Sequence, residues 1–207
     1  MGMMFEYPAG ATPLDPDDAR ALLPSHITTR EQLNDWEQLN VTKGELWAFG
    51  RDRSEILSTD FIQALHKQMF GDTWGWAGTI RSKEILPIGS PPEKIRSDLA
   101  NLWQDVTLQL KDGAWTVEVI AARVHHRLVS IHPFPNGNGR FSRTMTDLLL
   151  VLNGKTRFTW GIDLVHDGKA RQQYLAALRA ADAKDYGPLF GLLGLSHSNN
   201  TSSGRSD

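Results

Sequence analysis

Apolar side chains recur at intervals of three and four residues along most of this chain of 207 residues, which is the spacing of amphipathic helices. The pattern predicts an all-α fold in which helices are joined by short turns. Five consecutive apolar residues at 148–152 indicate that their helix lies in the centre of the core. The predicted helices run over residues 28–49, 58–71, 91–112, 116–132, 139–152, 168–183 and 188–195.

Local signals refine this pattern at its ends and between the helices. Thr28 and Glu31 have the spacing of a capping box, in which two side chains satisfy the opening amides of a helix. Residues 79–88 favour extended structure but contain Pro87, so we predict a short β-hairpin there. We also predict a short strand over 158–160.

No linker in the chain is long enough to require two separate cores. We divide the sequence into an N-terminal arm with a candidate regulatory helix (1–57), a helical domain (58–195) and a polar tail (196–207) that we expect to be disordered.

Composition narrows the classes of function. The net charge is −2 and both signs are mixed along the chain, which argues against direct nucleic-acid binding, because such binding requires a basic face. The chain contains no cysteine, which excludes disulfides and thiolate metal sites. No apolar run is long enough to cross a membrane, and no secretory signal is recognisable at the start. We therefore expect a cytoplasmic protein.

Chemistry-bearing residues concentrate between two predicted core helices, in the run IHPFPNGNGRFSR over 131–143. Gly137 and Gly139 allow a tight turn and a close approach of the backbone to a ligand. The turn leads into a helix N-terminus, where unpaired amides and the helix dipole favour an anion. Arg140 and Arg143 share one face of that helix, where two cations are unfavourable unless an anionic ligand offsets them.

His132 precedes this turn, at the end of the preceding helix, where the following proline disfavours helical geometry. Taken singly, a histidine before proline, a glycine turn and an exposed arginine are common structural features. Their combination within twelve residues favours a site that transfers a phosphoryl-type group to a hydroxyl, with the imidazole as proton acceptor. The loop lacks the Gly-Lys-Ser/Thr of a Walker A motif.

The run resembles the signature of the Fic family, His-Pro-Phe-x-Asp/Glu-Gly-Asn-Gly-Arg-x-x-Arg, and departs from it at one fixed position. The segment from Trp76 to Arg81 with the predicted hairpin, and the stretch at 91–93, also resemble the family. The segment at 12–15 and the helix over 27–49 resemble in particular a bacterial subgroup known as mobile mystery protein B.

This resemblance implies a Fic-type helical bundle with a β-hairpin flap, and a protein adenylyltransferase that moves AMP from ATP to a hydroxyl side chain of a target protein. It implies that His132 is the general base and that the flap, Arg81 to Ile88, binds the target by strand addition. It also implies ATP as substrate and Mg²⁺ as cofactor. The residues that would bind the nucleotide are Gly137, Asn138, Gly139, Arg140 and Arg143.

Asn136 is the departure from the signature, since the family has Asp or Glu there to bind Mg²⁺. A carboxamide oxygen can ligate a hard cation but carries no charge, so the nucleotide would have to supply most of the coordination. We expect a slower or conditionally active transferase.

Family members are often inhibited by a glutamate that pairs with the second motif arginine, here Arg143. Because Glu118 is the last glutamate of the chain, only an N-terminal residue can have this role, and Glu37 after Trp36 is the candidate. The surrounding residues match the family's inhibitory pattern poorly, and a solvated glutamate on an amphipathic helix is the alternative.

Three further interpretations of the sequence need to be weighed. His125, His126 and His132 are close in sequence, but neighbouring histidines on a helix point in different directions, so we expect hydrogen-bonded side chains rather than a metal site. The protein could instead be a kinase-like transferase. The phosphorylating branch of the family has a lysine in this loop, so Arg140 argues against that alternative. It could also be a nucleotide-binding regulatory or toxin-like module with weak activity, acting with an antitoxin-like partner.

Overall fold

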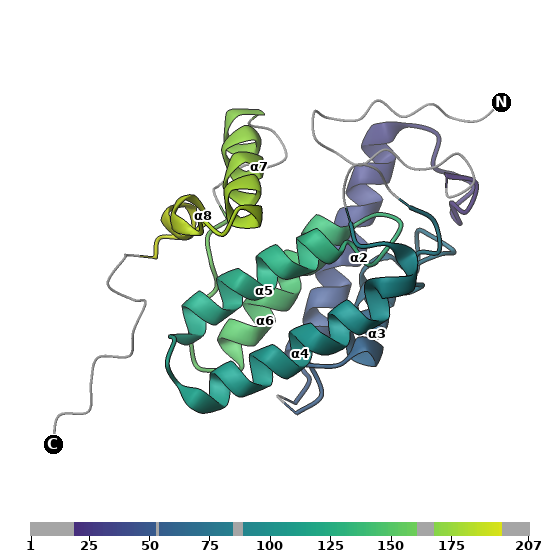
Figure 1. The fold of residues 1–207 in the computed structure, drawn as a ribbon. Helices are drawn as coiled ribbons and strands as arrows, with labels where there is room; N and C mark the ends of the chain where they lie inside the picture. The colour runs from purple at the N-terminus through teal and green to yellow at the C-terminus, as the bar shows by residue number, and fades with distance from the viewer. Residues whose placement is uncertain (1–18, 53, 85–88, 161–167, 196–207) are drawn as a thin grey trace, which may run out of the picture.

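The computed structural model describes residues 19–52, 54–84, 89–160 and 168–195 (Figure 1). The predicted helices are confirmed. The elements are α2 (Arg30–Phe49), α3 (Thr59–Phe70), the 3-10 turn η1 (Pro92–Lys94), α4 (Ile95–Asp112), α5 (Val117–Ile131), α6 (Asn138–Val151), α7 (Gly168–Asp182) and α8 (Gly187–Leu192).

The helices form a bundle around α5 and α6, which pack against each other. Helix α4 covers α5, whereas α2 and α3 pair with each other and both contact α6 (Figure 1). Helices α7 and α8 form a separate pair at one end of the bundle, where both contact α5. The main core therefore extends from α2 to α6, and a smaller core joins α7 and α8 to α5.

Helix α2 belongs to the main core and is not an appendage. Its Leu33, Val41 and Ala48 are buried together with side chains of α3. The candidate regulatory helix is therefore packed against the rest of the bundle, while the predicted polar tail at 196–207 lies outside the described residues.

Serine or threonine side chains cap three of the described helices, and the predicted capping box is shifted by one residue. Ser58 caps α3 and Thr116 caps α5. The capping box of α2 uses Thr29 and Gln32, one residue later than the predicted pair. The Gln32 carboxamide accepts hydrogen bonds from the amides of both Thr28 and Thr29, so the second threonine can serve as the cap.

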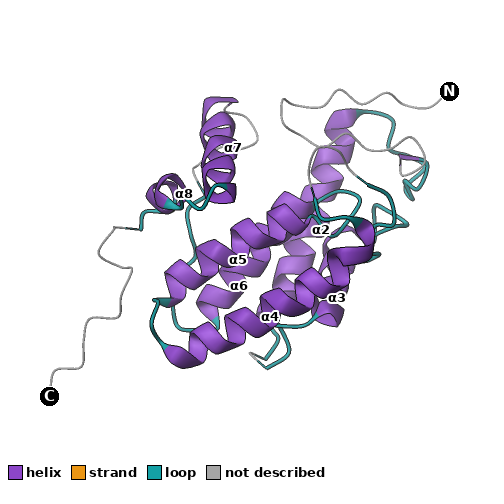
Figure 2. Ribbon diagram, in the orientation of Figure 1, coloured by secondary structure: helices purple, strands orange, loops and turns teal. Residues whose placement is uncertain are grey.

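The described residues contain helices and no strand (Figure 2). The hairpin predicted over 79–88 is not seen in its described part, 79–84, and residues 85–88 lie outside the described chain. The strand predicted over 158–160 is wrong. The Phe158 amide donates to the Asp147 carboxylate, and Trp160 has a left-handed backbone (φ 52°), so neither residue is available for a ladder.

None of the described helices combines the length and the apolar character that a membrane crossing requires.

Candidate active site

The loop between α5 and α6 turns through two left-handed residues. His132 is the C-cap of α5 with φ 52° and ψ 61°, and Gly137 is the N-cap of α6 with φ 76°. A β-carbon at Gly137 would lie 2.8 Å from the Phe70 ring, so both conformation and space require glycine there. The loop therefore directs the end of α5 towards the start of α6.

His132 is almost fully enclosed, with 6% of its surface exposed. Neither ring nitrogen has a hydrogen bond of good geometry to the described residues. Burial lowers the pKa of His132 to about 4. The imidazole is therefore neutral at pH 7 and able to accept a proton, which is the state that a general base requires.

The start of α6 offers backbone donors opposite this histidine. The first helical hydrogen bond runs from the Phe141 amide to the Gly137 carbonyl, so the amides of residues 138–140 precede it. Such opening amides form an anion site. Gly139 has room for a β-carbon, whose nearest neighbour would be Arg143 Nη1 at 3.7 Å. Packing within the described chain does not require glycine at this position, whereas a ligand close to the backbone would.

The side chain of Asn138 holds the loop together. Its Oδ1 accepts from the Phe134 amide at 3.0 Å, and its Nδ2 donates to the Phe134 carbonyl at 2.7 Å. Phe134 is fully buried and anchors the loop in the core. The backbone amide of Asn138 can thus donate to a phosphate, while its carboxamide is bonded to Phe134 within the loop.

Asn136 is also engaged within the loop. Its Oδ1 accepts from the Gly137 amide at 2.6 Å, and its backbone carbonyl lies 3.0 Å from His66 Nε2. The oxygen that could ligate a cation therefore already accepts a hydrogen bond.

Arg140 pairs with Glu37 of α2. Arg140 Nη1 lies 2.8 Å from Glu37 Oε2, and the other carboxylate oxygen accepts from Trp74 Nε1 at 2.7 Å. Glu37 is 8% exposed, so the alternative of a solvated glutamate is wrong. The arginine that Glu37 contacts is the first one of the motif and not Arg143.

Arg143 has a different environment. Burial lowers the pKa of Arg143, and the nearby Tyr174 side chain of α7 opposes that shift by favouring the charged guanidinium. The Tyr174 hydroxyl also lies 2.8 Å from His125 Nε2. Burial lowers the pKa of His125 to about 3, so this histidine is neutral and acts as a hydrogen-bonding support.

His66 supports the loop from beneath and was missed by the sequence interpretation. Its Nδ1 accepts from the Gly78 amide at 3.0 Å, so its Nε2 carries the proton and donates to the Asn136 carbonyl. The ring stacks on Phe134 with 3.8 Å between centroids. A histidine on the apolar face of α3, beside Ile62 and Leu65, was the signal in the sequence.

Histidines do not form a metal centre in the described part of the chain, where no group of three or more His, Cys, Asp or Glu residues could hold an ion. His126 instead lies 2.8 Å from Asp182 and 3.1 Å from the Tyr186 hydroxyl, which ties α5 to the last two helices. The expectation of hydrogen-bonded side chains is confirmed for His125 and His126.

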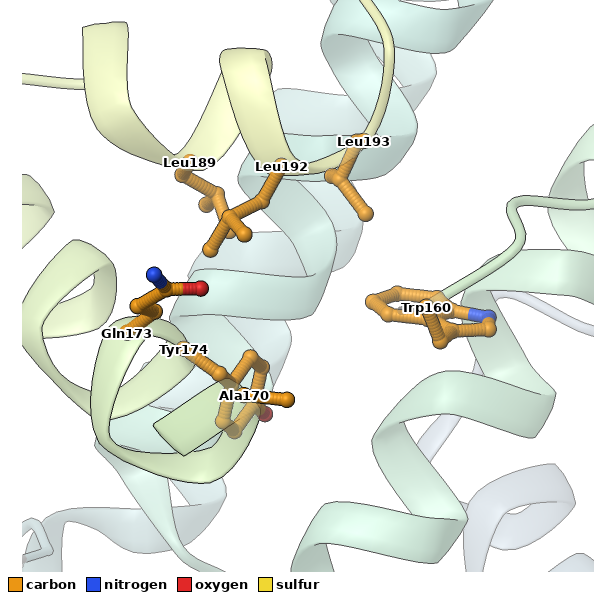
Figure 3. Close-up of a pocket in the computed structure, with 7 residues that line it drawn as sticks. All are labelled: Trp160, Ala170, Gln173, Tyr174, Leu189, Leu192 and Leu193. Carbon is orange, nitrogen blue, oxygen red and sulfur yellow. The ribbon is translucent and has the colours of Figure 1, made fainter. Parts of the chain in front are cut away.

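A cavity of about 80 Å³ lies between α7, α8 and Trp160 (Figure 3). Leucines, Ala170 and aromatic rings line it, and Tyr174 is the residue that links it to Arg143. It is smaller than the several hundred Å³ of ordinary ligand sites and contains no residue of the loop, so it is not the candidate active site.

Known proteins share this loop and this fold. The model of the Fic/DOC family matches residues 56–150, which include the whole loop. A Fido domain-containing protein of Dictyostelium discoideum is 32% identical over 108 residues, which cover 51% of this chain and 71% of that protein. The chain belongs to the Fic/DOC family.

Other members of the family extend this comparison. The protein adenylyltransferase fic-1 of Caenorhabditis elegans is 29% identical over 147 residues, or 67% of this chain and 26% of that protein. This chain spans about a quarter of the length of such curated relatives. The BepC protein of Bartonella tribocorum, solved with bound AMPPNP, has a TM-score of 0.64 at 18% identity, covering 85% of this chain and 95% of that one. The Fic fold is thereby established for the chain.

Proposed function

We propose that this Fic/DOC protein is a protein adenylyltransferase, which moves AMP from ATP to a hydroxyl side chain of a target protein. The observation that carries the proposal is the placement of a neutral, enclosed His132 on one side of the loop and the opening amides of α6 on the other. Relatives named as protein adenylyltransferases, and a fold neighbour with bound AMPPNP, support it.

In the proposed reaction, His132 accepts the proton of the target hydroxyl. The hydroxyl oxygen forms a bond to the α-phosphorus of ATP, the bond from that phosphorus to the α,β-bridging oxygen breaks, and pyrophosphate leaves. The amides at residues 138–140 stabilise the negative charge on the α- and β-phosphates, and Arg140 and Arg143 bind the β- and γ-phosphates.

ATP labelled separately at the α- and γ-phosphates tests this function. Transfer of the α-label to protein is expected, and it should be lost in His132→Ala. Transfer of the γ-label would instead indicate a kinase, and the absence of both would indicate a nucleotide-binding module.

Magnesium fits this loop poorly as a protein-held ion. Asn136 is neutral, its Oδ1 already accepts from Gly137, and the described residues contain no cluster of acidic ligands. The phosphates of ATP would then bind most of the Mg²⁺, and we assign the ion no step on the protein. We expect Asn136→Asp to reduce the Mg²⁺ concentration needed for half-maximal transfer, and an unchanged requirement would refute this role of Asn136.

Glu37 is proposed to inhibit the transferase. It neutralises Arg140 at 2.8 Å, and ATP phosphates would have to compete with this carboxylate for the guanidinium. Both charges lie partly out of water, where such pairs are stronger than on a surface.

A second candidate function, a nucleotide-binding regulatory or toxin-like module with weak activity, is favoured by two of these observations: the neutral Asn136 and the occupied Arg140. Under either function we propose a target protein bound at Arg81 to Ile88, an antitoxin-like partner, a cytoplasmic location and membership of the mobile mystery protein B subgroup.

A further inference from the structure

A buried arginine outside the motif lies directly beneath the loop. Arg81 is 5% exposed. Its Nε donates to the His132 carbonyl at 2.6 Å, and its Nη2 donates to the Ile131 carbonyl at 3.3 Å. On the other side, Nη1 donates to the Lys83 carbonyl at 2.8 Å, and Nη2 also donates to Ser90. One guanidinium thus joins two separate segments of backbone.

These hydrogen bonds compensate for the burial of the Arg81 charge. The last carbonyls of a helix have no partners within it, and the negative end of the helix dipole favours a cation there. Arg81 satisfies such carbonyls at the end of α5, and no salt bridge to it occurs within the described residues. The planar fork of an arginine can serve several carbonyls at once, which a lysine cannot do.

The same contacts hold His132 in its unusual backbone conformation. A left-handed residue other than glycine persists only when its surroundings enforce it. The His132 amide donates to the Leu128 carbonyl at 3.1 Å, and the His132 carbonyl is taken by Arg81. The peptide groups on both sides of this Cα are therefore fixed, and with them the position of the imidazole.

Backbone hydrogen bonds reinforce the junction. The Arg81 amide donates to the Pro133 carbonyl at 2.9 Å, and the Ser90 amide donates to the Ile131 carbonyl at 3.1 Å. Gly89 packs so closely that a β-carbon there would lie 2.5 Å from Arg81 Nη2 and 3.1 Å from His132 Cβ. Arg81, the first residue of the segment that we expect to bind the target, and Ser90, which follows that segment, are thus both attached to residues 131–133.

We propose that Arg81 is a positioning residue, which holds the general base His132 at a fixed place relative to the target-binding segment. The proposal rests on the proposed function. A target hydroxyl presented by the segment from Arg81 to Ile88 would then be directed to a general base whose backbone position is already set. Arg81 itself touches neither ATP nor the hydroxyl.

The first test compares Arg81→Lys with Arg127→Lys, a substitution of a surface arginine on α5 that pairs with Asp105. Transfer of α-labelled AMP to protein and binding of a fluorescent ATP analogue are measured for both. Arg81→Lys should lower kcat at least tenfold with ATP affinity within twofold of wild type, and Arg127→Lys should change neither. A folded Arg81→Lys variant with unchanged kcat would overturn the proposal.

The second test does not depend on activity. NMR of labelled imidazoles should show that the His132 ring of the wild type stays neutral down to about pH 4. The titration midpoint of His132 should be higher in Arg81→Gln, because the hydrogen bonds of Arg81 to the loop and a nearby cation are both removed. Gly89→Ala, whose β-carbon would displace the Arg81 guanidinium, should have the same effect if Arg81→Gln fails to fold. An unchanged His132 midpoint in a folded variant would contradict the inference.

These readouts separate the two proposals. If the wild type transfers no α-label, the proposed function fails, and the NMR midpoints still report whether Arg81 sets the environment of His132.

Discussion

The two arginines of the motif lie one turn apart on α6, yet their partners differ in kind. Arg140 is 31% exposed and pairs with the Glu37 carboxylate. Arg143 lies close to the neutral hydroxyl of Tyr174, which bonds to a neutral His125. One arginine is neutralised by its partner, and the other is oriented by its partner with its charge left intact.

This difference indicates how one arginine of the loop can be positioned for a ligand while the other is inhibited by a carboxylate. A carboxylate competes with phosphate for a guanidinium, whereas a phenol competes far less because it carries no charge. Under the proposed function, Arg143 would be ready for an incoming phosphate, and Arg140 would become available when Glu37 is displaced. The Fic/DOC chain would then be regulated at its first motif arginine.

The largest expected effect distinguishes the two arginines directly. Arg143→Ala should lower transfer of α-labelled AMP by roughly 100-fold, since it removes a donor that is ready for the phosphates. Arg140→Ala should cost about tenfold, because Glu37 already occupies this arginine in the resting protein. Initial rates at saturating ATP measure both, with thermal midpoints as the fold control. The reverse order would refute the comparison.

A change in the opposite direction is expected at the carboxylate. Glu37→Gln keeps an acceptor for Trp74 but removes the charge that holds Arg140, so transfer should rise by about tenfold, equivalent to about 1.4 kcal/mol. The control is Glu45→Gln on the same helix, which contacts Thr144 of α6 at 3.2 Å and does not contact Arg140. Equal rates for the two variants would show that Glu37 has a structural role only.

A smaller loss is expected at the support of Arg143. Tyr174→Phe removes the hydroxyl that lies close to Arg143 and bonds to His125, and a single hydrogen bond contributes about 1 kcal/mol, or roughly fivefold in rate. A rise in the KM for ATP would be the signature of a disoriented Arg143. If the KM and kcat both stay at their wild-type values, Tyr174 does not orient the arginine.

Acid should weaken the histidine supports of the loop without affecting transfer at neutral pH. His66 and His125 have folded pKa values of about 3, against 6.5 when unfolded. The unfolded chain therefore binds more protons, and the stability that each neutral ring contributes is complete above pH 6.5 and falls by about 1.4 kcal/mol per pH unit below it.

One group opposes this trend. Burial raises the pKa of Asp147 to about 6, so its protonation below that pH favours the folded state. A single carboxyl cannot offset two histidines. Urea denaturation at pH 7.0 and 5.0 should therefore show a lower free energy of unfolding at pH 5.0, with a smaller difference in His125→Gln. Equal stability at the two pH values would contradict the neutral, buried state of these rings.

The local sequence pattern was sufficient to predict the helices and to single out the loop. Apolar spacing predicted every described helix, and α8 ends earlier than expected because Gly194 is left-handed (φ 71°). Two successive threonines and two candidate partners made the cap of α2 ambiguous by one residue. His132, Arg140 and Arg143 could be proposed as site residues because their motif spans only twelve residues.

Long-range pairing was beyond the same reasoning. Glu37 and Arg140 are 103 positions apart, and nothing in the spacing on α2 specifies which arginine the carboxylate meets. The position of Tyr174 depends on how α7 packs against the bundle, and the hydrogen bonds of Arg81 depend on carbonyls that no sequence pattern displays. A buried polar residue on an apolar helix face, as at His66, was the one local sign of such a role.

The most direct test of this account is a crystal structure of the protein with a non-hydrolysable ATP analogue. The account predicts that the α-phosphate lies between His132 and the amides of residues 138–140. It also predicts that Arg140 leaves Glu37 for the β- and γ-phosphates, with Arg143 still bonded to Tyr174. An analogue bound away from the loop, or one bound there with the Arg140 and Glu37 pair intact, would contradict it.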